Sequence, residues 1–84
     1  KRCQAEAKTY DWFAGLNVPR KAVIISLLFN LGKPRFDAFK KTHAALEAGD
    51  FPTAAEELLD SKWAIQVGKR ADEMAAQLFS GEWH

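Results

Sequence analysis

Apolar side chains recur at helical spacing along most of this 84-residue chain. The first set shares one helix face at i, i+4, i+7 and i+11, and consists of Cys3, Ala7, Tyr10 and Ala14. We expect the first helix to end near Phe13, because Gly15 follows as a stop. No run of four or more residues alternates between apolar and polar, so the sequence predicts no β-strand.

The most apolar segment is VIISLLFNLG, which begins at Val23. Asn17 and Pro19 precede it and are typical of a helix start, because the amide can cap free N–H groups and the proline ring has a suitable φ. We expect this helix to run to Leu31, with Gly32 closing it. Because it is apolar on nearly every side, we expect it at the centre of the domain, surrounded by the other helices. Its expected interior residues are Val23, Ile24, Ile25, Leu27 and Leu28.

Shorter amphipathic segments follow this central helix. Pro34 is well placed at the start of the next helix, whose apolar face extends to Gly49. That face comprises Phe36, Phe39, His43 and Leu46. Asp50 can then cap the segment FPTAAEELL, in which Glu56 and Glu57 are expected to lie partly outward. The side chains expected to face the core there are Ala54, Ala55, Leu58 and Leu59.

The strongest late pattern lies near the C-terminus and is ended by Gly81. The apolar residues that share its helix face are Ala71, Met74, Ala75, Leu78 and Phe79. Together these segments predict an all-α fold in a single helical domain over residues 1–84. We expect a small bundle of about five to six short helices around the central hydrophobic helix.

The charge balance excludes some classes of partner. The chain has 12 basic and 11 acidic side chains, interspersed rather than in blocks, so it lacks the basic surface that nucleic-acid binding requires. Short helices joined at Gly are compatible with a helix-turn-helix, but the near-zero net charge argues against DNA binding. No apolar run reaches the length of about 18 residues that spans a bilayer, and no secretory leader opens the chain. We therefore expect no nucleic-acid partner, no membrane span and no signal peptide in this chain.

The sequence contains no complete catalytic apparatus. Cys3, His43 and His84 lack the spacing of zinc ligands, so we expect no metal site. The glycines are isolated rather than grouped in a phosphate loop, and no serine has a patterned histidine partner. Glu56 and Glu57 point about 100° apart on a helix, which is a poor arrangement for an acid and base that flank one bond. We expect neither catalytic residues nor a cofactor in this chain.

Two cations occupy an unfavourable position at the start of the last helix. Lys69 and Arg70 lie in its expected first turn, where the helix dipole disfavours each of them by about 0.3–1 kcal/mol. In one interpretation, Asp72 and Glu73 compensate for them. In the other, Arg70 points at an anion outside the chain, because its planar guanidinium matches a carboxylate.

Three short patterns occur together in the chain, and we do not expect this combination by chance. They are an amide between an apolar-aromatic run and Leu-Gly, the spacing Trp-x-x-Gln-x-x-x-Arg, and a terminal small-Gly-x-Trp. They lie within RKAVIISLLFNLGKPRF and DSKWAIQVGKRADEMAAQLFSGEW. In these segments the chain closely resembles the C-terminal helical lobe of the T-even-phage-type lysozymes, glycoside hydrolase family twenty-four. The likeness runs without apparent gaps from Arg20 to Trp83 and implies a lysozyme-like fold for this lobe.

This resemblance implies an endolysin, a bacteriolytic muramidase that hydrolyses the β-1,4 bond between N-acetylmuramic acid and N-acetylglucosamine in peptidoglycan. In that family the cleft lies between two lobes. The catalytic Glu, Asp and Thr belong to the N-terminal lobe, which has no counterpart among Lys1 to Leu16. The chain, which begins without a Met, is therefore expected to be the substrate-binding C-terminal lobe and to be inactive alone.

Partners and place of action follow from the same resemblance. The implied partners are the glycan strand of peptidoglycan and the missing N-terminal lobe. The family's usual route starts in the host cytoplasm and ends, after release, at the bacterial cell wall in the periplasm. We expect the same for this chain.

The resemblance also implies roles for residues of the cleft wall. Four are implied to contact the glycan: Phe29, Asn30, Thr42 and Glu57. Glu57 stands where the family commonly has an amide. Four are implied to support the cleft: Gly32, Trp63, Gln66 and Arg70. Arg70 matches the basic residue that pairs with the catalytic Glu across the cleft, which would explain its place at the helix start.

Each of these roles has a structural alternative. Phe29 and Trp63 are of a type common in cores, and the indole N–H of Trp63 would then need a partner such as Asn30. The Asn30 amide can instead bind carbonyls at the end of its own helix. The remaining candidates can be plain solvent-exposed residues: Thr42, Glu57 and Gln66. For the whole chain, the alternative is a non-catalytic helical binding module, derived from the lysozyme fold or unrelated to it.

Overall fold

The computed structural model describes the backbone of residues 2–83 and the side chains of residues 5–83. Within this range the chain forms helices and no strand, so the predicted all-α fold is confirmed. Residues 2–83 contain seven α-helices and one 3₁₀ turn, which is more helices than expected. They are α1 (Arg2–Ala7), η1 (Phe13–Gly15), α2 (Val18–Leu31), α3 (Lys33–Asp37), α4 (Lys40–Ala48), α5 (Phe51–Leu59), α6 (Lys62–Val67) and α7 (Lys69–Ser80).

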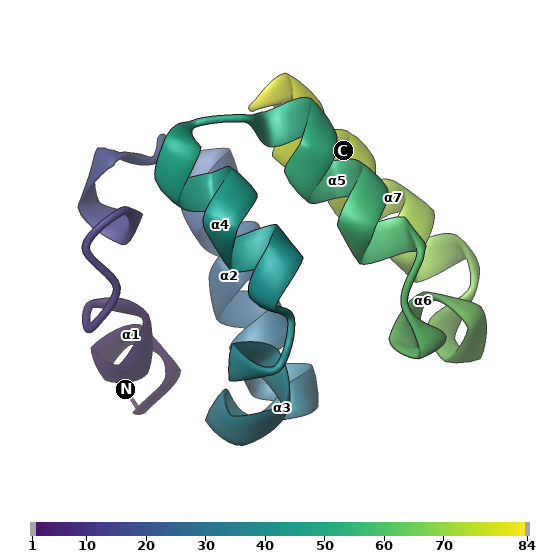
Figure 1. Ribbon diagram of the computed structural model, residues 1–84, viewed down its shortest axis with the longest axis horizontal. Coiled ribbons are helices and arrows are strands. Elements are labelled where there is room, and N and C mark those ends of the chain that lie inside the picture. The colour runs from purple at the N-terminus through teal and green to yellow at the C-terminus, as the bar shows by residue number, and fades with distance from the viewer. Residues whose placement is uncertain (1, 84) are drawn as a thin grey trace.

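The helices pack around one hydrophobic core (Figure 1). Helix α5 contacts α4 and α7, while α2 contacts α1, α3 and α7. Ile24 of α2, Leu58 of α5 and Leu78 of α7 are fully buried in this core. None of the helices within residues 2–83 is long and apolar enough to cross a membrane.

Helix α2 has the predicted bounds. The side chain of Asn17 accepts a hydrogen bond from Arg20 N at 3.1 Å and caps the helix, which Gly32 closes. The buried side chains are Val23, Ile24, Leu27, Leu28 and Leu31, whereas Ile25 is half-buried and Val18 and Phe29 are exposed. The other helices therefore cover most of α2 but do not enclose it on every side.

The first helix is shorter than the apolar spacing predicts. Helix α1 ends at Ala7 instead of near Phe13. The reason is local, because Thr9 N and Thr9 Oγ1 both bond the carbonyl of Glu6, at 3.1 and 2.6 Å, and tighten the turn there. Of the predicted face, Ala7 is buried, Tyr10 half-buried and Ala14 exposed, while the side chain of Cys3 lies outside the described residues.

The helix predicted to follow Pro34 consists of two helices, α3 and α4. They are separated at Phe39, whose ψ of 63° lies outside the helical region. The chain turns tightly there, and Lys40 N bonds Ala38 O at 2.9 Å instead of continuing the helical hydrogen bonds. The break turns the start of α4 toward the surface on which the candidate site lies.

The caps predicted for the later helices are present. The Asp50 carboxylate accepts hydrogen bonds from Thr53 N at 3.3 Å and Thr53 Oγ1 at 2.6 Å, which starts α5. Helix α7 ends at Gly81, as predicted. Its last turn is bound to the first turn of α2, because Gln77 Nε2 donates to Pro19 O at 2.7 Å.

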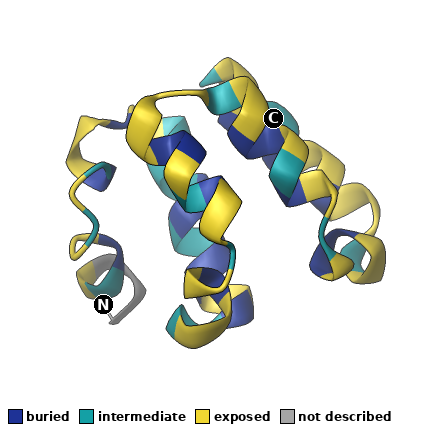
Figure 2. Cartoon of the chain, viewed as in Figure 1, coloured by how far each residue is buried: buried dark blue, intermediate teal, exposed yellow. Residues whose placement is uncertain are grey.

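Two residues predicted to face the core do not. Leu59 of α5 is 42% exposed and Phe79 of α7 is 55% exposed. Each directly follows a fully buried residue, Leu58 or Leu78, and therefore points about 100° away from the core. Figure 2 shows that α5 has both buried and exposed positions. Because Leu59 and Phe79 are among the exposed ones, the apolar stripes of α5 and α7 are wider than the face that the fold covers.

Candidate functional site

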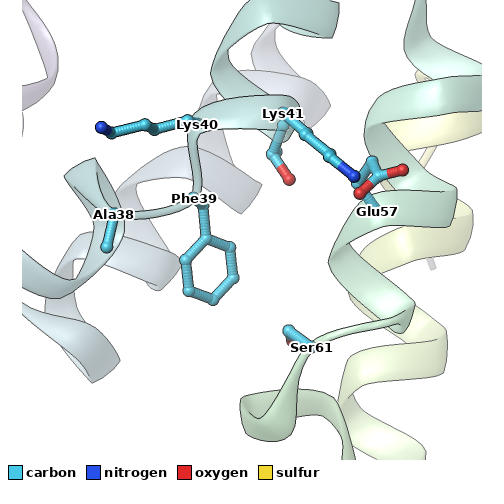
Figure 3. Close-up of a pocket in the computed structure, with 7 residues that line it drawn as sticks. Ala38, Phe39, Lys40, Lys41, Glu57 and Ser61 are labelled. Atoms are coloured by element: carbon cyan, nitrogen blue, oxygen red, sulfur yellow. The ribbon is translucent and has the colours of Figure 1, made fainter.

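A surface pocket of about 360 Å³ lies where the start of α4 faces the end of α5 (Figure 3). The two helices come together because Gly49, with a φ of 74°, turns the chain back and Asp50 caps the next helix. The pocket volume is typical of sites for small ligands. The residues that line the pocket are Ala38, Phe39, Lys40, Lys41, Thr42, Glu57 and Ser61.

Thr42 is a buried polar residue in the wall of this pocket. Its side chain is 2% exposed, and its hydroxyl forms no hydrogen bond with any described residue. Thr42 is nevertheless one of the residues that line the pocket. The alternative that Thr42 is a plain surface residue is therefore wrong. Its hydroxyl can donate to or accept from a bound molecule.

Charged side chains from two helices approach each other at the pocket. Figure 3 shows Lys41 of α4 pointing toward Glu57 of α5, while Lys40 points away. The ring of Phe39 extends below the start of α4 in this view, on the side of the pocket where Ser61 lies. Among the described residues neither Lys41 nor Glu57 forms an ion pair, so both groups remain available to a ligand.

Ser61 connects the pocket to α6, the helix that carries Trp63 and Gln66. Its hydroxyl donates to Leu58 O at 2.7 Å and accepts from Ala64 N at 3.2 Å, which caps α6. Both hydrogen bonds tie the residue to its own chain. Ser61 therefore shapes the pocket wall and sets where α6 begins.

The glycan contacts implied for α2 lie outside this pocket. Phe29 is 78% exposed, so the alternative that it is a core residue is wrong. Asn30 is also exposed, and its amide donates to Ser26 O at 2.8 Å rather than to Trp63. The acceptor is an interior carbonyl of α2, four residues before Asn30, and not one of the free carbonyls at the helix end that the sequence suggested as an alternative. Gly32 follows as the residue that ends α2.

The supporting residues implied for α6 and α7 divide between core and surface. Trp63 is buried in the hydrophobic core, whereas Gln66 is exposed. Arg70 is exposed in the first turn of α7 and forms no hydrogen bond or ion pair with a described residue. Asp72 and Glu73 therefore do not compensate for Arg70 through an ion pair, and its guanidinium is free to bind an anion outside the chain.

The fold brings two of the eight implied site residues into one pocket. Thr42 and Glu57 lie fifteen positions apart in the sequence and share its lining. The other six do not line it. They lie at the end of α2, on α6 and at the start of α7, which Figure 1 shows at the same end of the bundle as the α3–α4 junction.

Five of the residues that line the pocket were not among the sequence candidates: Ala38, Phe39, Lys40, Lys41 and Ser61. A local signal could have found Ser61, because a serine directly before the helical segment KWAIQV is typical of an N-cap. No such signal exists for Phe39 or Lys41. The helix break that orients them has neither Gly nor Pro at its centre.

A second group of polar side chains joins α3 to the segment after α1. Lys33 Nζ lies 3.0 Å from one carboxylate oxygen of Asp37, and the Tyr10 hydroxyl donates to the other. The hydrogen bond from Tyr10 lowers the pKa of Asp37, and the hydrogen bond to Asp37 raises the pKa of Lys33. Burial raises the pKa of Tyr10. The fold thus favours an ionised Asp37 beside a neutral Tyr10 and a protonated Lys33.

His43 packs against this group. Its Nε2–H donates to Phe36 O at 2.9 Å, and its ring centroid lies 4.4 Å from that of Phe36 and 5.1 Å from that of Tyr10. Burial lowers the pKa of His43 below its ordinary value of 6.5, although the Phe36 carbonyl and Asp37 act in the opposite direction. The folded chain therefore favours the neutral imidazole.

We expect the chain to lose stability when the solution is acidified below about pH 6.5. Because the pKa of His43 is lower in the folded chain, the unfolded chain takes up the proton first. The contribution of His43 to stability is fully present above pH 6.5 and is lost as the pH falls through the lower pKa that His43 has in the folded chain. Asp37 also loses its contribution to stability as the pH falls below 3.8, because its pKa is lowered in the folded chain. Thermal melts between about pH 7.5 and about pH 5 measure the first effect.

A substitution separates His43 from other causes of this pH dependence. His43→Gln removes the titrating group and should flatten the melting temperature over that interval. His84→Gln removes the other histidine of the sequence and serves as the matched control. Equal slopes for the wild type and His43→Gln would show that another group is responsible.

Among residues 5–83, no group of three or more His, Cys, Asp or Glu side chains is arranged to hold a metal ion. The side chains of Cys3 and His84 lie outside that range. No family model, no curated protein and no solved structure matches this chain. The indications of function are therefore the sequence resemblance and the pocket residues themselves.

Proposed function

We propose that this chain is the substrate-binding C-terminal lobe of a phage-type endolysin, a muramidase of glycoside hydrolase family twenty-four. In this proposal it binds the glycan strand of peptidoglycan and does not hydrolyse it alone. The resemblance from Arg20 to Trp83 motivates the proposal. The observation that supports it most is that Thr42 and Glu57, both implied to contact glycan, line the same pocket.

The chemistry of the pocket suits a sugar. The Thr42 hydroxyl can donate and accept hydrogen bonds, the Glu57 carboxylate accepts them and the Lys41 ammonium donates them. The Phe39 ring adds apolar surface beside these groups. A few placed polar groups on a partly apolar wall are typical of a small-molecule site.

The same pocket lacks the pair of carboxylates that glycoside hydrolysis requires. Most glycosidases place two carboxyl groups on either side of the scissile bond, one of them with a raised pKa as general acid. Among the described residues Glu57 is the one carboxylate in the pocket lining, and Glu56 lines a different groove. Hydrolysis would therefore need carboxylates from a second lobe. The exposed Arg70 is available to pair with one of them.

A binding assay on the 84-residue chain tests the proposal. We expect the chain to sediment with purified peptidoglycan sacculi without clearing their turbidity. Thr42→Val should weaken this binding by about 2- to 10-fold, because it removes one hydrogen-bonding hydroxyl and keeps the shape of the side chain. The melting temperature should not fall, since that hydroxyl has no partner among the described residues.

A matched pair of substitutions tests whether the Glu57 carboxylate contributes to binding. Glu57→Gln removes the charge in the pocket, while Glu73→Gln removes the charge of an exposed residue on α7. We expect only Glu57→Gln to weaken binding to sacculi. Equal binding by the wild type, Thr42→Val and Glu57→Gln would contradict the assignment of this pocket to the glycan.

A non-catalytic binding module with the same fold would sediment with sacculi in the same way. The polypeptide expressed with the residues encoded upstream of Lys1 separates the two functions. Clearing of the sacculi by this polypeptide supports the muramidase, whereas binding without clearing supports the module. The proposed place of action, the bacterial cell wall reached from the host cytoplasm, follows from the muramidase assignment.

A further inference from the structure

An apolar groove of about 350 Å³ runs between α5 and α7. Two matching stripes form it, and each stripe occupies positions i, i+3, i+4 and i+7 of its helix. Helix α5 supplies Pro52, Ala55, Glu56 and Leu59, and α7 supplies Asp72, Ala75, Ala76 and Phe79. The groove shares no lining residue with the candidate glycan pocket.

The groove is built on the outer side of the two helices. Leu58 and Leu78 point into the core and are fully buried. Leu59 and Phe79 come directly after them and leave the core, and both contribute to the groove. The outer side of a surface helix is ordinarily polar. This pair of helices therefore presents a second apolar face in addition to the one that forms the core.

The groove has the shape of a site for a third helix. Helices α5 and α7 are packed side by side (Figure 1). Ala55, Ala75 and Ala76 have small side chains, which let a further helix approach closely. Leu59 and Phe79 provide larger apolar walls. Grooves of this kind bind amphipathic helices through anchor residues at i, i+3 or i+4, and i+7.

The charges at the groove select the partner. Both charged residues that line it, Glu56 and Asp72, are carboxylates, and neither forms an ion pair with a described residue. Glu57 and Asp60 surround an adjoining hollow together with Glu56. Lys69 lines a further hollow that shares Leu59 and Asp72 with the groove. Among the residues that line these three hollows, four carboxylates therefore face one ammonium group. A helix with basic flanks is therefore attracted to this surface, and one with acidic flanks is repelled.

We propose that the α5–α7 groove binds an amphipathic helix of another protein, with apolar anchors at i, i+3 or i+4, and i+7 and with Lys or Arg on both flanks. The groove supplies apolar contact, and Glu56 and Asp72 supply the charge complementarity. This binding does not depend on the function of the pocket that Thr42 and Glu57 line.

A synthetic peptide tests this proposal. The probe is a fluorescent peptide of about 18 residues with Leu at the anchor positions and Lys on both flanks. The control peptide has Glu in place of Lys at every flanking position. Each is titrated with the 84-residue chain and followed by fluorescence anisotropy. We expect the Lys peptide to bind at least about tenfold more tightly than the Glu peptide.

Substitutions in the groove locate the binding. Leu59→Lys and Phe79→Lys replace exposed walls of the groove, so the fold should persist, and each should weaken binding of the Lys peptide at least about tenfold. Val18→Lys replaces an exposed apolar residue of α2 outside the groove and should leave binding unchanged. The double substitution Glu56→Lys and Asp72→Lys should reverse the preference, so that the Glu peptide binds more tightly. Thermal melts confirm that each variant is folded.

Three results would overturn the proposal. The first is equal affinity of the wild type for the Lys and Glu peptides. The second is unchanged binding of the Lys peptide by folded Leu59→Lys and Phe79→Lys. The third is self-association of the wild type in sedimentation that Leu59→Lys abolishes, because the groove would then be occupied by a second copy of this chain.

Discussion

Replacing Leu27 with Ala is expected to lower the free energy of unfolding by about 2–5 kcal/mol. Leu27 lies inside α2 and is 0% exposed, so its truncation removes buried methyl groups and leaves a cavity. That range comes in part from Leu→Ala substitutions in a phage lysozyme, a protein of the family proposed for this chain. Small domains have total stabilities of about 5–15 kcal/mol, so the loss would be a large fraction of the whole.

Urea denaturation followed by circular dichroism measures this effect as a shift of the unfolding midpoint at constant slope. Val18→Ala is the matched control, because Val18 lies on the same helix and is 66% exposed. We expect Val18→Ala to change stability by no more than about 0.5 kcal/mol. An unchanged midpoint for Leu27→Ala would remove Leu27 from the centre of the core.

Replacing Arg20 with Met is expected to cost about 1.5–3 kcal/mol, the range for hydrogen bonds made by a charged group. The guanidinium lies at the C-terminal end of α7, where Nε donates to Leu78 O at 2.8 Å and Nη2 donates to Phe79 O at 2.9 Å. Carbonyls in the last turn of a helix lack partners within the helix and carry its negative dipole end. The same guanidinium lies 3.7 Å from the ring centroid of Phe51, so one side chain joins α2, α5 and α7.

Two further substitutions separate charge from geometry at this position. Arg20→Lys keeps the charge but not the planar pair of donors, so its unfolding midpoint should lie between those of the wild type and Arg20→Met. Arg35→Met is the matched control, because Arg35 is exposed on α3 and its side chain binds no described residue. If Arg20→Met and Arg35→Met unfold at the same urea concentration, the contacts of Arg20 do not stabilise the fold.

Helix ends with local signals were predictable from the sequence. Asn17, Pro19 and Gly32 mark the limits of α2, and Asp50 marks the start of α5, because caps and ring constraints act within a few residues. Gly81 was predicted as a helix stop. The structure adds a second reason for glycine there, since a Cβ would lie 2.8 Å from Arg20 Cζ.

The spacing of apolar residues did not predict which of them are buried where burial depends on the packing of neighbouring helices. Leu59 and Phe79 continue an apolar stripe in the sequence, but the packing of the helices leaves them 42% and 55% exposed, and they line a groove instead. The predicted end of helix α1 was wrong for a different reason. The Thr9 hydroxyl binds the Glu6 carbonyl and ends the helix, although the apolar spacing continues to Ala14.

The candidate site was only partly predictable. The resemblance named Thr42 and Glu57, and both line the pocket. It did not indicate Lys41, whose position depends on the break between α3 and α4. The roles of Phe29 and Arg70 at a glycan cleft remain predictions, and both side chains are exposed.

The sequence by itself determined the helical class, the bounds of the central helix and the residue types available for chemistry. These follow from caps, turns and spacing, which act over a few neighbouring residues. Only the tertiary structure decided that Thr42 and Glu57 line one pocket, and that Arg20 binds the end of α7. Such contacts join helices that are far apart in the chain, so they depend on how the helices pack, which local spacing does not specify.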